Sequence, residues 1–183
     1  MTHARVHAMA EERSGPVVGD DLVPDPRLIA TRCIDIAAPP PRVFPWLRQM
    51  GFGRAGWYSW DIIDNLGRRS ARAIHPEWQS LVAGDVVPGG PVDFMAAVVD
   101  PPRALVIVLN GDGRIGARVP FSLAYELRDT EVNGVTGTRL VSRVRFRVDL
   151  PGGRLVERLL LGPGDGVMVR RQLRNLAGRA AET

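Results

Sequence analysis

The chain of 183 residues contains no lysine, only one cysteine, three histidines and no long apolar run. Because Cys33 is alone, an intrachain disulfide and a multi-cysteine metal site are excluded. His3, His7 and His75 lack metal-ligand spacing from one another and from a carboxylate, so we expect neither a metal nor a cofactor. No run approaches the roughly 18 apolar residues that a membrane span requires.

Without lysine, the net charge of +4 rests on arginine. The arginines are spread along the chain and no nucleic-acid reader motif accompanies them, which argues against binding to nucleic acid. The apolar fraction of 45% and the charged fraction of 24% are ordinary for a globular domain. The first ten residues lack the apolar core of a secretory signal, so we expect a cytoplasmic protein and leave open whether it is a monomer or a homodimer.

Turn residues divide the chain into a short arm and a longer structured part. Residues 1–27 are polar, aperiodic and interrupted by prolines, so we expect a largely irregular arm ahead of a single domain at 28–183. From residue 81 onward, short runs of strand-forming residues alternate with turn residues, a pattern typical of an antiparallel meander. These runs lie at 85–87, 92–99, 105–109, 120–127 and 138–148.

The first part of the domain predicts a strand followed by two short helices. Residues 28–37 have strand character, and the prolines at 39–41 end the strand because proline donates no backbone hydrogen bond. Helical spacing then predicts one helix that stops at Gly51 and a second over 57–66.

Alternation assigns the two faces of the last strand. Leu140, Val144 and Phe146 share one face, which we expect to be covered. The opposite face carries Arg139, Arg143, Arg145 and Arg147. We expect two of them, Arg143 and Arg145, to form a solvated ladder with Glu126 across the strand pair, as the alternative to anchoring a ligand carboxylate.

A final helix is predicted after Asp165, a suitable N-cap residue. One apolar stripe runs along this helix, and we expect it to lie against the covered face of the sheet. The stripe consists of Val169, Leu173, Leu176 and Ala180.

Gly51, Gly53 and Gly56 satisfy the spacing of a dinucleotide-binding fingerprint. The fingerprint requires a strand before the glycines and the start of a helix after them, whereas here a predicted helix precedes them and no βαβ unit follows. We therefore interpret these glycines as a corner between two helices, where left-handed backbone carries little penalty.

Short sequence blocks join this element order to a known family. The blocks are Ile34-Asp35-Ile36-Ala37-Ala38-Pro39-Pro40, Pro45-Trp46-Leu47, Gln49-Met50-Gly51, Arg54-Ala55-Gly56-Trp57-Tyr58-Ser59 and Pro76-Glu77-Trp78-Gln79. Over about residues 19 to 180 the chain resembles the SRPBCC superfamily, with START-like domains and the polyketide cyclase/dehydrase group as relatives. The resemblance implies an α+β helix-grip fold, in which a curved antiparallel sheet wraps around a long C-terminal helix and encloses an apolar cavity. Members bind lipids, sterols, polyketides or hormones there, and only some are enzymes.

Our leading hypothesis is therefore a small hydrophobic ligand bound between the C-terminal helix and the covered sheet face, in a pocket of roughly 300 Å³ or more. Trp57, Tyr58 and Trp60 would lie near its entrance, unless they are ordinary core residues. Trp78 would cover the mouth or plug the sheet. The remaining predicted ligand contacts are Phe94, Phe121, Tyr125, Phe146 and Met168.

Two alternatives remain open. A polyketide cyclase or aromatase would need an inward polar group for general acid/base catalysis, and Asp61, Tyr58 and Tyr125 are the candidates. For Asp61, a salt bridge with an arginine is the favoured role, so the sequence favours a binding protein over an enzyme. A structural or regulatory partner domain would instead expose an apolar patch.

Overall fold

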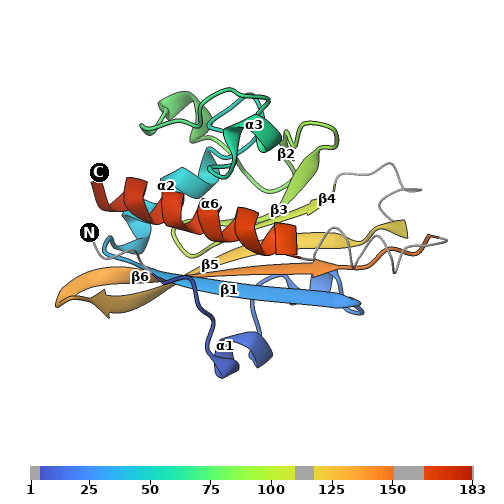
Figure 1. Cartoon of the computed structure of the whole chain (residues 1–183), viewed down its shortest axis with the longest axis horizontal. Coiled ribbons are helices and arrows are strands. Elements are labelled where there is room, and N and C mark those ends of the chain that lie inside the picture. Colours follow the sequence, from blue (N-terminus) through green and yellow to red (C-terminus); the bar gives the residue numbers. More distant parts are fainter. Residues whose placement is uncertain (1–4, 110–117, 151–162, 183) are drawn as a thin grey trace.

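The computed structural model describes residues 5–109, 118–150 and 163–182. One antiparallel sheet of six strands has the order β1-β6-β5-β4-β3-β2, and α6 lies along one of its faces while α1 lies on the opposite side (Figure 1). Within these residues no helix has the length and apolar character of a membrane span. In chain order the elements are α1 (Ala10–Ser14), η1 (Asp20–Leu22), β1 (Leu28–Ile36), α2 (Pro40–Arg48), α3 (Asp61–Asp64), η2 (Pro76–Trp78), β2 (Val86–Val87), β3 (Phe94–Asp100), β4 (Ala104–Leu109), β5 (Phe121–Val132), β6 (Val135–Phe146) and α6 (Pro163–Glu182).

The predicted α+β helix-grip arrangement is confirmed. β1 ends before the prolines, and α2 begins at Pro40, where a missing N–H costs nothing because the first helical N–H groups have no intrahelical partner. β5 and β6 form the long central hairpin, and β6 also pairs with β1 from Leu28 opposite Phe146 to Ile36 opposite Thr138. α6 begins at Pro163, so Asp165 lies inside its first turn and not ahead of it.

The main core lies between the sheet, α2 and α6. Leu173, Leu176 and Ala180 are fully buried and Val169 packs at the edge of the core, which confirms the predicted stripe. The inner face of the sheet meets them with alternate residues of its strands, as the alternation predicted. These residues include Leu105, Ile107, Tyr125, Leu127 and Leu140.

The expectation of a solvated arginine face is wrong, because the N-terminal arm covers it. Ala8 and Val17 of the arm pack with Cys33, Val106, Ala124 and Val141 on the outer face of the sheet. Beneath the arm only 3% of the Arg143 side chain is exposed. Glu126 pairs with Arg128 and accepts a hydrogen bond from the Val18 N–H, so it forms no ladder with the arginines of β6.

The predicted second helix is also shorter than expected. Only Asp61–Asp64 is helical, a single turn. Gly56 and Tyr58 have φ values of 76° and 59°, and such left-handed residues prevent a helix from beginning at Trp57. Trp57 and Tyr58 consequently lie in a turn, and they do not share a helix with Asp61.

Candidate functional site

The site begins at the glycine corner that links α2 to the rest of the chain. Gly51, Gly53 and Gly56 have φ values of 137°, 72° and 76°, which confirms the predicted left-handed corner. Gly51 and Gly56 exchange backbone hydrogen bonds of 3.3 and 3.0 Å. Because this closed turn fixes the exit direction of the chain, the next residue, Trp57, is directed toward the sheet, where it contacts Phe94.

An apolar pocket of about 240 Å³ lies between α6, the inner face of β3 to β5 and the segment that follows the corner. As formed by the described residues, it is open on one side. Of the predicted ligand contacts, Trp57, Phe94 and Met168 line it. The other lining residues are Ser59, Asp64, Gly89, Ile107, Leu123, Val169 and Gln172. The volume is below the roughly 300 Å³ or more that we expected, so the prediction of the pocket size is not met.

A buried amide forms the polar floor of this pocket. Gln172 of α6 accepts a hydrogen bond of 2.8 Å from the Tyr125 hydroxyl and donates one of 2.9 Å to the Trp57 carbonyl. These bonds join α6, β5 and the corner segment in one network. Tyr125 is fully buried behind Gln172, and so the structure places it beneath the pocket wall and not on it.

A row of aromatic rings extends from the pocket wall along the sheet. Trp57 meets Phe94 edge-on with 5.6 Å between ring centroids, Phe94 lies 5.6 Å from Phe121, and Phe121 lies 6.1 Å from Phe146. Within the described residues only the first two line the pocket. Phe121 and Phe146 stiffen the wall from behind, since each ring holds the next in place.

Tyr58 lies in the core and not at the pocket. Its side chain is fully buried, its ring meets Trp46 edge-on, and its hydroxyl accepts a hydrogen bond of 2.8 Å from Gln49. Burial raises the pKa of Tyr58, so the phenol does not ionise near neutral pH. The carbonyl of Tyr58 accepts a hydrogen bond from Asn175, which fastens α6 to the corner.

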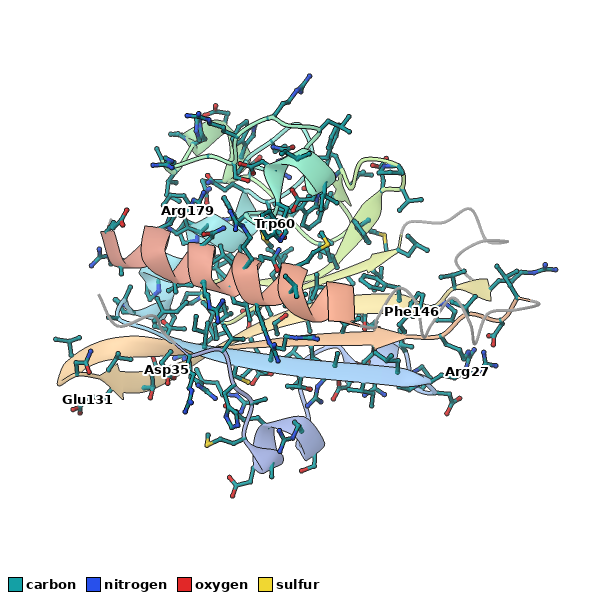
Figure 2. All side chains as sticks on the ribbon, viewed as in Figure 1. Arg27, Asp35, Trp60, Glu131, Phe146 and Arg179 are labelled. Carbon is teal, nitrogen blue, oxygen red and sulfur yellow. The ribbon has the colours of Figure 1, made fainter. Side chains whose placement is uncertain are left out.

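Trp60 and Trp78 lie outside the pocket. The Trp60 ring is 40% exposed and has the Arg171 guanidinium 3.9 Å above its centroid, a cation–π contact. Figure 2 labels Trp60 above the middle of α6 and Arg179 nearer the C-terminal end of this helix. Trp78 stacks against His75 with centroids 4.5 Å apart and lines a separate shallow hollow with Arg54 and other residues.

Asp61 is held by the loop that follows α3. Its carboxylate accepts hydrogen bonds from the N–H and the hydroxyl of Ser70, and Ser70 Oγ also lies 3.3 Å from the Tyr58 N–H. In the part of the chain that the structure describes, Ser70 takes the place of the arginine that we expected. Asp61 is therefore a structural link between α3 and the following loop, and it does not line the pocket.

Asp64, one turn further on, is the carboxylate that lines the pocket. Neither of its oxygens has a hydrogen-bond partner among the described residues, and both are inaccessible to water. Burial and, as the smaller cause, the nearby charge of Asp61 together raise the pKa of Asp64 to about 6. The backbone N–H groups of Ser59 and Trp60 lie close enough to limit the rise, but none makes a hydrogen bond of regular geometry.

Sequence reasoning missed Asp64 and Gln172. A signal existed for Gln172, which lies three residues after Val169 and hence on the inner side of the final helix. For Asp64 the sequence offered only its position three residues after Asp61. Which of the two carboxylates becomes desolvated depends on Ser70, whose approach the local sequence does not reveal.

A larger hollow of about 670 Å³ lies on the other side of the sheet, beneath the arm. Charged side chains of both signs line it, among them Arg5, Glu12, Asp35, Arg128 and Arg139. Such a lining suits water and ions better than an apolar molecule. Among the described residues, no three His, Cys, Asp or Glu side chains gather as metal ligands would.

No protein-family model matches the chain, and no curated protein matches its sequence. Solved structures with a similar arrangement include truncated norcoclaurine synthase from Thalictrum flavum, at 12% identity and a TM-score of 0.47, with 85% of this chain and 94% of that one covered. A Rhodobacter sphaeroides protein matches at 14% identity and a TM-score of 0.48 over 85% and 99% of the two chains. Protein MLL2253 from Mesorhizobium loti matches at 17% identity and a TM-score of 0.44 over 84% and 98%.

The fold is established by the chain's own architecture. β1 is followed by the short helices α2 and α3, then by the antiparallel strands β2 to β6, and α6 packs on the inner face of the sheet. This is the helix-grip fold, the architecture that the resemblance to the SRPBCC superfamily implied.

Proposed function

We propose that this protein binds a small, flat, hydrophobic molecule in the pocket between α6 and the inner face of the sheet. The observation that carries the proposal is the composition of the pocket wall, in which the aromatic and aliphatic side chains of Trp57, Phe94, Leu123 and Met168 surround a few polar groups. Ligand pockets combine a mostly apolar wall with a small number of placed polar groups in this way.

The volume limits the class of ligand. An apolar cavity of about 150 Å³ holds benzene. A pocket of about 240 Å³ thus fits a compound of one or two fused rings, and its open side allows a substituent to extend outward. Trp57 and Phe94 offer ring edges and faces for stacking, so an aromatic compound fits better than a bulky aliphatic one.

Native mass spectrometry of the purified protein, followed by a thermal-shift screen of one- and two-ring aromatic compounds, tests this proposal. A ligand at one hundred times its Kd adds about 2.7 kcal/mol, which corresponds to about 5–10 °C in Tm for a chain of this size. Leu123→Trp should fill the pocket and abolish the shift. Ile29→Trp, at a half-exposed position on β1, serves as the control and should leave the shift unchanged.

Absence of any co-purified compound and of any stabilising compound would count against ligand binding. A Leu123→Trp protein that responds like the wild type would place the binding elsewhere, and the assignment of this pocket would then be wrong.

A second candidate function, a cyclase or aromatase using general acid/base catalysis, has support from Asp64. A carboxyl group whose pKa is about 6 exists in both protonation states near neutral pH, and so it can accept a proton and return it. Asp64 borders the pocket, whereas Asp61 and Tyr58 do not. The reaction this would serve is proton abstraction and return on a poly-β-keto chain.

Turnover of a short poly-β-keto thioester mimic, followed by liquid chromatography and mass spectrometry, tests the catalytic candidate. Asp64→Asn should abolish cyclisation and retain the thermal shift with pocket ligands, while Asp61→Asn should lower stability and retain cyclisation. Equal turnover by Asp64→Asn and the wild type would eliminate this role.

A further inference from the structure

The segment from Ser59 to Leu66 is inverted relative to an ordinary surface turn. Its apolar side chains point outward, since Ile62, Ile63 and Leu66 are 81%, 65% and 76% exposed. Its polar groups point inward, where Ser59 Oγ and both Asp64 carboxylate oxygens are buried without hydrogen-bond partners among the described residues. Both features are unfavourable in water, because the buried polar groups lose their hydration and the exposed isoleucines keep apolar surface in contact with water.

The surface around these side chains is positively charged. Arg68, Arg69 and Arg72 follow Leu66 closely in the chain and are exposed. The two acids of the same stretch, Asp61 and Asp64, are half-buried, so neither presents a fully exposed negative charge. The outer side of α6 adds three more exposed arginines, Arg170, Arg171 and Arg174.

Arg171 connects the apolar segment with α6, since its guanidinium stacks on Trp60 and its Nε donates a hydrogen bond of 3.0 Å to the Ser59 carbonyl. We call the exposed side chains of Trp60, Ile62, Ile63 and Leu66, together with these arginines, the docking patch. The patch lies next to the pocket, because Ser59 and Asp64 of the same segment, 59–66, line the pocket.

We propose that the docking patch binds peripherally to an anionic lipid surface and brings the open side of the pocket to that surface. The two isoleucines of the one-turn helix α3 and the leucine that follows it can insert among acyl chains, and Trp60 suits the headgroup level. The surrounding arginines complement the negative potential of acidic lipids. An apolar compound dissolves in the membrane, so this placement sets the pocket where such a ligand is concentrated.

Sedimentation with vesicles of 70% phosphatidylcholine and 30% phosphatidylglycerol, compared with pure phosphatidylcholine, tests the proposal. The wild-type protein should sediment with the anionic vesicles and stay in the supernatant with the neutral ones. Ile62→Ser with Ile63→Ser should weaken binding on the order of tenfold or more for each isoleucine. Ile29→Ser with Val135→Ser, at positions 50% and 52% exposed outside the docking patch, should bind as the wild type does.

The charge contribution is tested with the same vesicles. Arg68→Gln with Arg69→Gln should weaken binding about fivefold for each arginine, from about 1 kcal/mol per basic residue at an anionic surface. Raising the salt concentration should weaken the wild type and affect this variant less. Equal binding by the isoleucine variant and its control would overturn the proposal, as would the absence of binding to anionic vesicles at low salt.

Size-exclusion chromatography separates the lipid surface from a second copy of the chain. A wild-type protein that elutes as a dimer, and an Ile62→Ser with Ile63→Ser variant that elutes as a monomer, would show that another copy covers the docking patch. None of these measurements uses a pocket ligand, so failure of vesicle binding leaves the proposed ligand binding to its own test.

Discussion

Removal of the Arg143 side chain should detach the N-terminal arm from the sheet. The guanidinium donates hydrogen bonds to the carbonyls of Glu12, Arg13 and Gly15 at 2.6, 3.2 and 2.9 Å, and to the Asp20 carboxylate at 2.7 Å. One buried side chain of β6 thus holds four positions of the arm. The variant Arg143→Met retains the aliphatic packing and removes every one of these donors.

The expected loss in the free energy of unfolding is about 3–5 kcal/mol, the usual cost of breaking a buried ion pair by removing one partner. It arises because the carbonyls of Glu12, Arg13 and Gly15 would lose their Arg143 donors, each at a cost of about 1–3 kcal/mol, whereas the Asp20 carboxylate would keep the hydrogen bond from the Val17 N–H. Detachment of the arm relieves that cost by returning these groups to water. Detachment also removes the apolar contacts of Ala8 and Val17 with the sheet. The decrease in the free energy of unfolding therefore cannot exceed the free energy with which the arm packs on the sheet.

Arg147→Met provides the matched control. Arg147 directly follows β6 and also reaches the side of the arm, where its Nη1 donates to the Asp25 carbonyl, but it is 29% exposed and pairs with Asp149 near the surface. Such pairs contribute about 1 kcal/mol or less. Urea unfolding followed by tryptophan fluorescence measures both variants, and limited trypsin digestion after Arg5 and Arg13 reports release of the arm.

Combination with Asp20→Asn makes the test specific. If Arg143 acts through the arm, the two substitutions should be non-additive by about 1–3 kcal/mol, because each removes the same contact. Equal losses below 1 kcal/mol for Arg143→Met and Arg147→Met, with trypsin cleavage unchanged, would refute the reasoning.

Three further predictions concern the corner, the pocket and the arm. Gly56→Ala should destabilise the fold by about 2–3 kcal/mol, because φ is 76° there and the added Cβ would lie 2.6 Å from Ser70 Oγ. Gly53→Ala is the control: its φ is 72°, but no atom lies within 4 Å of the added Cβ, so it should cost about 1 kcal/mol in the same urea assay. Asp64→Asn should stabilise the protein by about 1–2 kcal/mol at pH 7 and by little at pH 4. The reason is that folding raises the pKa of Asp64 from 3.8 to about 6, so ionisation of this group destabilises the folded protein as pH rises. A carboxyl NMR titration with a midpoint near 4 would contradict this. Glu12, whose pKa the Arg139 hydrogen bonds lower from 4.5 to about 2, should have the opposite effect: stability falls as pH drops from about 4.5 toward 2, and Glu12→Gln should remove that dependence in acid-unfolding curves.

The fold was predictable because its determinants are local and periodic. Alternation in β5 and β6 assigned the inner face correctly, and the stripe of α6 from Val169 to Ala180 identified its partner. The turn glycines marked the corner. Each of these signals needs only the residues within one element, and a sequence displays those directly.

The covering of the outer face was not predictable on that basis. Alternate arginines in a strand are typical of a solvated face, since arginine is seldom fully buried without a partner. In this chain the arm residues that accept hydrogen bonds from Arg143 lie more than 120 residues earlier, in an arm with little regular structure. Their contribution is mainly backbone carbonyl groups, which every sequence has and no motif reveals.

The candidate site was predictable in its apolar part and less so in its polar part. Phe94 and Met168 followed from strand parity and helix position, whereas Tyr58 was misplaced because the spacing of 57–66 matched a helix. The left-handed backbone at Tyr58 turns its ring into the core, where Trp46 and Gln49 receive it. Tertiary packing overrides local propensity in such cases.

The inverted segment links these shortfalls to function. A turn shaped for stability alone would bury Ile62 and expose Asp64, yet the protein does the reverse beside its apolar pocket. Conflicts between local rules and the fold are expected where a surface serves binding or catalysis. In the two proposals, Asp64 would act at the pocket, and Ile62 and Ile63 would make apolar contacts outside it. Because α3 carries Asp64 on its inner side and Ile62 and Ile63 on its outer side, substitutions on the two sides should separate the two proposed functions. Asp64→Asn should alter chemistry inside the pocket and retain vesicle binding. Ile62→Ser with Ile63→Ser should weaken vesicle binding and retain the chemistry inside the pocket.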